Sequence, residues 1–245
     1  GLSLIPVIFN IKYSNKKNKN LFLYILFFFI LAIYVTGERA NFLKCLTVVL
    51  PLIFFVEKKN LPKIIIGSGI LLVVISAIFL NKSEFKAKYY ENVFLPIKNN
   101  NYNVFKYIDE TEYGKHRSDA LKIFNEKKFF GVGNKNFRII CEKDKYNFLN
   151  NEKFDKVSCT THPHQFYYEL LAEHGILGFI IFLIVIFLFI KQFIHFFIKR
   201  KDFIILSNFI LLISFFYPIL PSGSFFTSFN ASIFWINITL FYSLM

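Results

Sequence analysis

Residues 162–179 read HPHQFYYELLAEHGILGF and lead directly into a long apolar run. Three of the five histidines of the chain lie in this stretch. Pro163 fixes φ near the helical value and lacks a backbone donor, so it suits the first turn of a helix. We therefore expect His164 in the first turn of a short helix that Gly175 ends as a C-terminal cap. The stretch predicts a helix at a membrane surface with a histidine near its start.

The position of His164 favours a neutral imidazole. A helix start carries partial positive charge, which disfavours imidazolium, and a neutral imidazole is the form that a general base needs. The plainer alternative is that His164 only caps or packs the start of the helix. A zinc site built from His162, His164 and either Asp155 or Cys159 is a further alternative. Pro163 disrupts the strand on which the two histidines would face the same way, so we expect no metal.

The composition predicts an all-α membrane protein. The chain is 55% hydrophobic and 20% aromatic, with a mean hydropathy of +0.46, and its apolar runs repeatedly reach the length that spans a bilayer. We expect a polytopic transmembrane helical bundle, interrupted between spans by a long, partly helical extracytoplasmic segment. The predicted complete spans are 21–35, 42–56, 64–80, 175–198, 203–220 and 225–245.

Three regions follow from these spans. Residues 1–80 are transmembrane helices, 81–174 form the hydrophilic segment, and 175–245 are three C-terminal transmembrane helices. Residues 1–11 resemble the tail of an earlier span, and no signal peptide is visible in the sequence. We therefore expect the chain to be the C-terminal portion of a single, longer membrane domain.

The net charge of +13 comes mostly from lysine, which is the basic residue at 25 of 29 positions. The phenylalanines lie in the predicted spans rather than beside the basic residues, so we expect no nucleic-acid partner. Outside the long segment, the basic residues concentrate in 12–19, 58–63 and 191–201. The positive-inside rule assigns these loops to the cytoplasm and the segment 81–174 to the opposite face.

The long segment has helical and irregular parts. Apolar residues recur at helical spacing within 118–127, and Gly131 and Gly133 then predict a turn. Residues 141–159 are polar and irregular. Cys141 and Cys159 either form a disulfide or remain free thiols, whereas Cys45 is expected to pack inside a span.

Arginine is rare in this lysine-rich chain, occurring only at Arg39, Arg117, Arg138 and Arg200. A guanidinium grips phosphate oxygens with two parallel donors, which an ammonium cannot do. We interpret Arg39 and Arg117 as phosphate-binding residues and Arg138 as a weaker candidate. The alternatives are an interfacial anchor for Arg39 and a solvated ion pair for Arg117. Arg200 lies in a basic cytoplasmic run.

His164-Gln165, followed after nine residues by Gly175-Ile-Leu-Gly178, resembles the signature of the O-antigen ligase and Wzy polymerase superfamily. Thr36-Gly37-Glu38-Arg39 is similar to the short outward loop of that family that carries an arginine. The run 117–137 resembles the segment that follows the second arginine of the family, with Lys128 in place of its usual proline. Together these resemblances cover about residues 36–180.

The resemblance implies a periplasmic glycosyltransferase of the bacterial inner membrane. Its donor would be a glycan on undecaprenyl diphosphate, with Arg39 and Arg117 stabilising the diphosphate leaving group. His164 would take the proton of an acceptor hydroxyl. His162, Gln165 and Arg138 are secondary site residues, and the scheme requires neither a cofactor nor a metal.

The acceptor decides between related activities. Transfer to lipid A core is O-antigen ligation in lipopolysaccharide biosynthesis, which the histidine motif favours. Transfer to a growing glycan is polymerisation of O-antigen or exopolysaccharide, and transfer to a protein hydroxyl is O-oligosaccharyl transfer. A polysaccharide transporter or flippase without chemistry is the alternative of another class, and a purely structural protein is a third.

Overall fold

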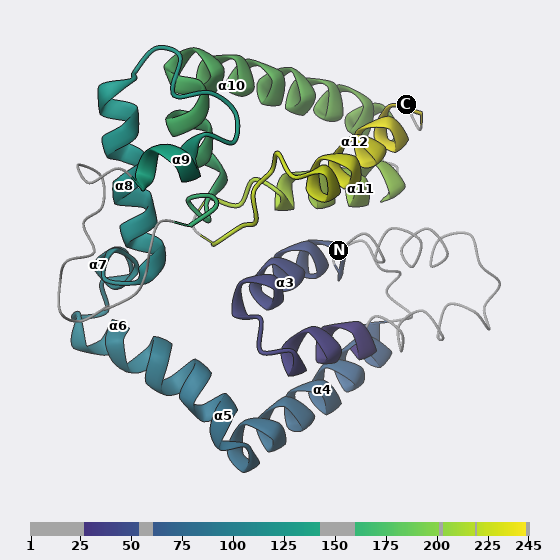
Figure 1. The fold of residues 1–245 in the computed structure, drawn as a ribbon. Coiled ribbons are helices and arrows are strands. Elements are labelled where there is room, and N and C mark those ends of the chain that lie inside the picture. Colours follow the sequence, from purple (N-terminus) through teal and green to yellow (C-terminus); the bar gives the residue numbers. More distant parts are fainter. Residues whose placement is uncertain (1–26, 54–60, 143–159, 201–202, 219, 244–245) are drawn as a thin grey trace. The chain divides into compact units, whose positions relative to one another are not determined.

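The structure is a computed structural model that describes residues 27–53, 61–142, 160–200, 203–218 and 220–243 (Figure 1). Helices dominate these residues, and no strand occurs among them. Residues 27–35 are helical. The helices that follow are α3 (Arg39–Ile53), α4 (Leu61–Asn81), α5 (Ser83–Lys86), the π-helix η2 (Ala87–Phe94), α6 (Leu95–Asn99), α7 (Val104–Asp109), α8 (Glu112–Glu126), α9 (Phe137–Cys141), α10 (Phe166–Arg200), α11 (Phe203–Ser214) and α12 (Ser228–Ser243).

Two of the described helices are long and apolar enough to cross a bilayer. They contain Pro62–Asn81 and Phe166–Arg200, with 20 and 35 residues. Three of the other predicted spans overlap α3, α11 and α12, whose described parts have 15, 12 and 16 residues. The fourth, 21–35, is described only over the helical residues 27–35. About 20 residues are needed to span 30 Å of hydrocarbon. The all-helical class is confirmed, and the described helices support a membrane protein with two such spans.

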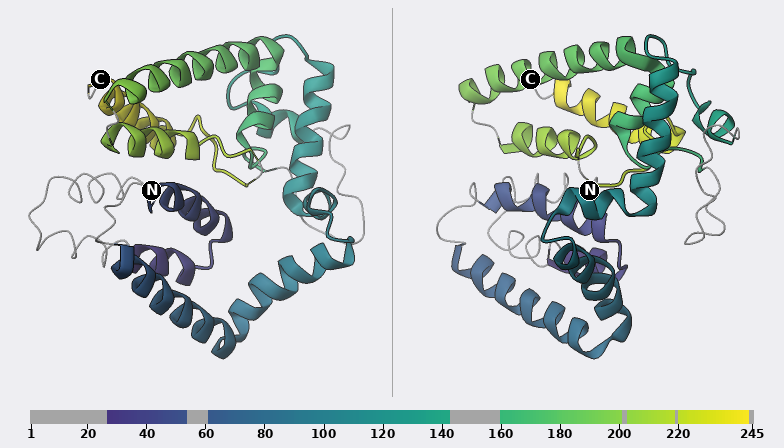
Figure 2. Two further views of the ribbon diagram at one scale, coloured as in Figure 1. Left: turned by 180° about the vertical axis from the view of Figure 1, so that it is seen from behind. Right: turned by 90° about the vertical axis from the view of Figure 1, so that its left-hand side faces the viewer.

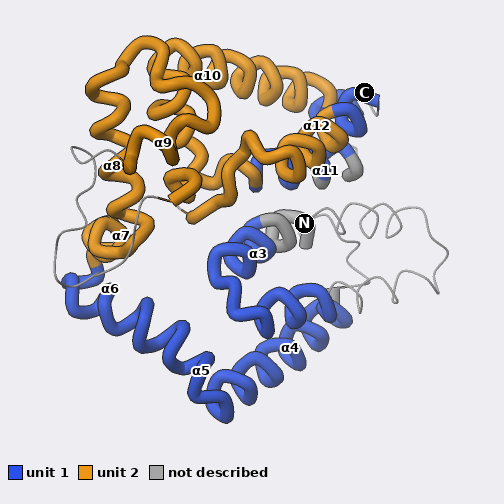
Figure 3. The backbone as a smooth tube through the Cα atoms, viewed as in Figure 1, with its two compact units in different colours: residues 1–102, 197–214, 239–245 blue, residues 103–196, 215–238 orange. Residues whose placement is uncertain are grey.

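The chain divides into two compact units (Figure 3). The first unit comprises residues 1–102, 197–214 and 239–245, and the second comprises 103–196 and 215–238. The first unit has an aromatic cluster around Tyr34, which is 4% exposed. The Tyr34 ring stacks on Phe85 and Tyr89, with centroid distances of 5.4 Å for both, and meets Phe42 edge-on at 5.3 Å. These contacts join helix 27–35 to α3, α5 and η2.

The second unit contains the predicted helix and the predicted turn. The helix α8 covers most of 118–127 but begins earlier, because the Thr111 hydroxyl accepts a hydrogen bond from the Gly114 N–H at 3.3 Å and caps it. After α8, Gly131 and Gly133 have φ of +66° and +94°, as the turn prediction requires. A small core then joins α8, α9 and α10, formed by Ala120, Ile123, Phe137, Cys141 and Ala172.

The helix α10 has a sharp kink at Gly175, where φ is +65° and ψ is −166°. Figures 1 and 2 show the chain changing direction between the short part 166–174 and the long part 176–200, beside α8. The short part folds back on the long part, since the rings of Phe166 and Phe182 lie 4.7 Å apart edge to face. Gly175 therefore ends the short helix, as the sequence predicts.

Candidate active site

His164 lies just before α10 and not inside its first turn, so that prediction was wrong. The helix begins at Phe166, and the backbone of His164 has a left-handed φ of +54°. The Gln165 side chain caps the helix, because its Oε1 accepts hydrogen bonds from the N–H groups of Tyr167 at 2.9 Å and Tyr168 at 3.2 Å. Glutamine rarely caps the start of a helix, so the sequence pattern indicated instead that the helix begins at Pro163.

Residues 216–218 and 220–225, here called the strap, hold this turn in place. The N–H of Ser222 donates to the carbonyl oxygen of His164 at 2.8 Å. The Gln165 Nε2 donates to the carbonyl of Pro218 at 2.8 Å, and the Tyr167 hydroxyl donates to that of Phe216 at 2.7 Å. The backbone around His164 is thus fixed by contacts with a segment far along the chain.

The imidazole of His164 belongs to a cluster of aromatic rings. Its centroid lies 4.2 Å from that of His162 and 5.6 Å from that of His116. The ring of Tyr113 meets it edge to face at 5.4 Å. Tyr113 and His116 both come from α8, so this helix and the turn before α10 together form the site. His116 is 4% exposed.

Burial keeps all three imidazoles neutral near pH 7. It lowers the pKa of His164, whereas the negative charge of Glu112 raises it. Burial lowers the pKa of His116 to about 4, with further lowering by His164 and Lys115. Burial also lowers the pKa of His162 to about 4, opposed by a backbone hydrogen bond to Ser222. The neutral state expected for His164 therefore has burial as its cause, not the start of a helix.

Arg117 lies on α8 next to His116. Its guanidinium carbon is 5.6 Å from the centroid of the Tyr168 ring, a cation–π contact with the first turn of α10. In the second unit, the structure thus brings Arg117, on α8, together with the segment before α10 that carries His162, His164 and Gln165. Arg138 lies on α9 and is exposed.

Arg39 belongs to the first unit and is the first residue of α3, so its predicted loop position was wrong. The turn is restricted to residues 36–38 because Gly37, with φ of +73°, reverses the chain early enough for α3 to start. The Arg39 Nη1 donates to the carbonyl oxygen of Lys88 in η2 at 3.0 Å.

Two buried glutamate side chains on α10 organise the surroundings of the site. Glu173 is 1% exposed, and its oxygens accept hydrogen bonds from the N–H groups of Lys135 at 2.8 Å and Phe137 at 3.2 Å. Glu169 is 2% exposed and accepts from the Ser224 hydroxyl and, at 3.2 Å, from the Phe225 N–H. Glu173 therefore fixes the start of α9, and Glu169 fixes the strap.

The two glycines of the motif allow close approaches. A Cβ on Gly175 would collide with the carbonyl of Phe129, and a Cβ on Gly178 would collide with the Cβ of His174. The chain before α9 lies against this kink, where the N–H of Val132 donates to the Ala172 carbonyl at 3.0 Å. The kinked helix and the 128–133 turn therefore pack closely against each other.

Sequence reasoning missed His116, Tyr113, Glu169 and Glu173. Glu169 and Glu173 are four residues apart on one face of an apolar helix, and charged residues in that setting are buried only when they have partners. That spacing could have identified the two glutamates from the sequence. His116 precedes a singled-out arginine, but its contact with His164 depends on the fold and has no local signal.

The described residues bear on the zinc site and on the disulfide that the sequence left open. Within the described ranges, no group of three or more His, Cys, Asp or Glu side chains is arranged to hold a metal ion. Cys141 is disulfide-bonded and Cys45 is free and buried. Asp155 and Cys159 lie outside the described residues.

A family profile described as O-antigen ligase matches residues 24–183, which is more than half of the chain. The chain belongs to the O-antigen ligase family. The match includes Arg39, Arg117 and His164, and it confirms the resemblance drawn from the motifs. Membership makes the chain a membrane protein of the O-antigen ligase or polymerase kind, whose substrates are a lipid-linked glycan and a lipid-bound acceptor. No curated protein and no solved structure matches the chain.

Proposed function

We propose that the chain is a glycosyltransferase that moves a glycan from undecaprenyl diphosphate to a hydroxyl of lipid A core, as an O-antigen ligase. The observation that carries the proposal is the half-buried imidazole of His164, whose lowered pKa leaves it unprotonated near pH 7. An uncharged imidazole can accept a proton. Arg117 on α8 also places a guanidinium over the ring of Tyr168, in the first turn of α10.

The chemistry is a single displacement. His164 accepts the proton of the acceptor hydroxyl while the hydroxyl oxygen forms a bond to the anomeric carbon of the donor sugar. The bond between that carbon and the diphosphate oxygen breaks, and undecaprenyl diphosphate leaves with its negative charge. The guanidinium groups of Arg117 and Arg39 stabilise that charge, so the leaving group needs no proton and no step requires a metal.

The other residues of the site have supporting roles in this proposal. His162 shields one face of the His164 imidazole, at a centroid distance of 4.2 Å. Gln165 orients His164 through its two backbone contacts in α10 and its hydrogen bond to the strap. Arg138, which is exposed on α9, is the weaker candidate for contact with the donor.

Reconstitution of the full-length protein tests the proposal most directly. Proteoliposomes would receive a radiolabelled glycan on undecaprenyl diphosphate and, in separate reactions, lipid A core, no further acceptor, or an acceptor protein. Label on lipid A core supports ligation, whereas longer lipid-linked glycans indicate a polymerase and labelled protein indicates an oligosaccharyltransferase. Label that crosses the bilayer without transfer would favour a transporter, and no reaction at all would favour a structural role.

We propose further that the site faces the periplasm from a multi-pass protein of the inner membrane. The disulfide at Cys141 supports an oxidising compartment for this segment. Single cysteines at Lys106 and Lys199 test the orientation in a background that lacks Cys45, Cys141 and Cys159, since both positions are exposed. An impermeant thiol reagent added to intact spheroplasts should label position 106 and not 199, and the reverse pattern contradicts the orientation.

A further inference from the structure

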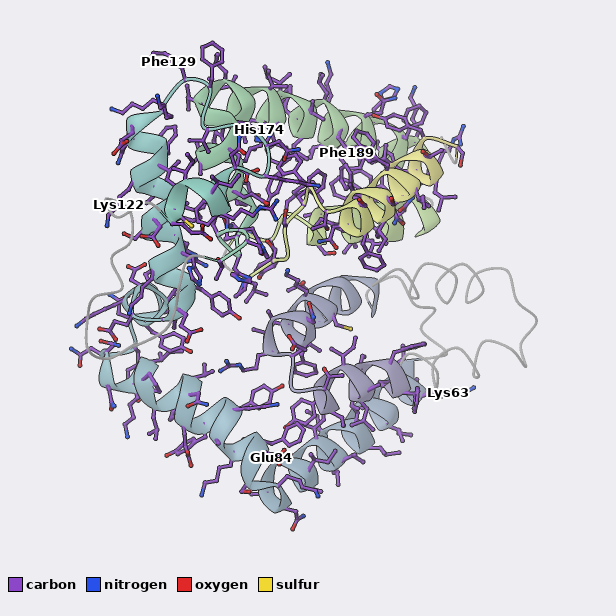
Figure 4. The ribbon with its side chains drawn as sticks, in the orientation of Figure 1. Lys63, Glu84, Lys122, Phe129, His174 and Phe189 are labelled. Carbon is purple, nitrogen blue, oxygen red and sulfur yellow. The ribbon has the colours of Figure 1, made fainter. Side chains whose placement is uncertain are left out.

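Two adjacent aromatic rings are exposed between α8 and α9. Phe129 and Phe130 are 68% and 77% exposed, although burying aromatic area is strongly favourable. Figure 4 shows the Phe129 side chain projecting away from the ribbon of this loop. Lys127 and Lys128 precede them and are also exposed. The four residues form a segment, 127–130, with two cationic and then two large apolar side chains.

The backbone of this segment is fixed at the kink of α10. The N–H of Ile176 donates to the carbonyl of Lys128 at 2.7 Å, and the N–H of Leu177 donates to that of Phe129 at 3.3 Å. A Cβ on Gly175 would collide with the Phe129 carbonyl, so the two backbones are in close contact. The exposed rings are therefore held beside the first residues of the long part of α10.

Those first residues begin an apolar surface. Leu177, Ile180 and Ile181 are 42%, 45% and 62% exposed, within one of the two candidate membrane spans. Phe129 and Phe130 thus extend the apolar surface of the span at the end where the hydrophilic segment joins it. Segments that lie at a membrane interface combine phenylalanine or other large apolar side chains, which enter the acyl boundary, with lysines that interact with anionic lipids.

We propose that segment 127–130 inserts into the bilayer interface, with the two phenylalanine rings at the boundary of the acyl chains and the two lysines among anionic phospholipid headgroups. The segment then connects the membrane to the site, because the chain that follows it is bonded to α10 through Val132 and Glu173. This inference concerns the membrane contact alone and does not depend on the chemistry at His164.

Fluorescence quenching in full-length protein tests the insertion. The chain has one tryptophan, so a Trp235→Phe background allows a single reporter to be placed by Phe129→Trp. Ile139→Trp is the matched control, because Ile139 is 55% exposed on α9 in the same unit. The vesicles contain phosphatidylcholine and phosphatidylglycerol with acyl chains brominated near the headgroup. Iodide serves as the quencher in water.

The brominated lipids should quench the tryptophan at position 129 several-fold more than that at 139, and iodide should show the opposite order. Phe130→Trp provides a second reporter with the same expected result if Phe129→Trp does not fold. Equal quenching of positions 129 and 139 by brominated lipid overturns the proposal. Protection of position 129 from both quenchers also overturns it, because it indicates a protein contact in place of lipid.

Discussion

The N–H of Ser222 donates a hydrogen bond to the carbonyl oxygen of His164, at 2.8 Å. This bond joins the strap to a residue whose φ of +54° is unfavourable for most side chains. A non-glycine residue persists in such a conformation only where the surrounding structure determines it. The strap and the Gln165 cap supply that constraint, so the backbone of His164 is positioned by the residue that follows it and by a segment far along the chain.

The left-handed backbone determines which substitution tests the role of His164. Asparagine tolerates this conformation better than alanine and cannot act as a base, so His164→Asn should fold. We expect glycan transfer to fall by a factor of at least about 10² to 10⁴, the usual contribution of general-base catalysis. His162→Asn should have a milder effect, and His195→Asn, at an exposed position in α10, should have none.

The measurement is the initial rate of transfer by each variant, with equal amounts of folded protein in the membrane. A folded His164→Asn protein that transfers glycan at a near-native rate would restrict His164 to a structural role.

The pH dependence of transfer should follow the pKa of His164. Because burial lowers this pKa below its usual value of 6.5, kcat/KM should rise with pH through a midpoint below 6.5 and then level off. His116 and His162 stay neutral down to about pH 4, so they do not contribute within this range. The charge of Glu112 raises the pKa of His164, so Glu112→Gln should move the midpoint to lower pH.

The profile is obtained from rates at low donor concentration, with Glu91→Gln as the control because Glu91 is exposed on η2. A midpoint that Glu112→Gln leaves unchanged, or a profile that falls as pH rises through 6.5, contradicts the assignment of His164 as the base.

The sequence predicted the features that depend on single residues with strong backbone preferences. Gly175, Gly131 and Gly133 were expected to break or turn the chain, and all three have positive φ. The start of α10 was predicted wrongly because a glutamine side chain took the capping role. Local patterns could not indicate the contact of His116 with His164, since it joins α8 to a turn much later in the chain.

A positive charge without the planar shape of a guanidinium should not support transfer at positions 39 and 117. Arg39→Lys and Arg117→Lys should each lose most transfer activity, because an ammonium cannot form two parallel bonds to phosphate oxygens. Arg117→Lys also weakens the contact with Tyr168. The comparison is with Arg200→Lys, in the last turn of α10, which should be neutral. Transfer rates are measured against donor concentration, and near-normal rates in both lysine variants would exclude phosphate binding by these arginines.

The kink of α10 should tolerate only glycine. Gly175→Ala places a Cβ against the Phe129 carbonyl in a conformation essentially restricted to glycine, which costs about 1–3 kcal/mol before the collision is counted. Gly69→Ala is the matched control, because a Cβ there has no atom within 4 Å and the position is inside α4. It should be neutral or stabilising by about 0.5–1 kcal/mol. Thermal unfolding in detergent compares the two, and equal stabilities would contradict the described kink.

The hydroxyl of Ser224 should be required to hold the strap against α10. Ser224→Ala leaves the buried carboxylate of Glu169 with the Phe225 N–H but without its hydroxyl donor. Leaving a buried acceptor without such a partner costs about 1–3 kcal/mol of unfolding free energy. Because the same strap binds the His164 carbonyl, transfer should also slow, while the pH midpoint of the remaining activity stays in place.

Ser224→Thr keeps a hydroxyl and should recover both stability and rate, which a mere change of side-chain volume would not explain. Ser243→Ala is the control, because Ser243 donates to the Leu240 carbonyl at an exposed position, and its loss should fall within about 0.5 kcal/mol. Chemical denaturation of the detergent-solubilised protein gives the stabilities, and transfer assays give the rates. If Ser224→Ala matches Ser243→Ala in both measurements, the contact between Glu169 and the strap contributes neither to the stability of the protein nor to the position of His164.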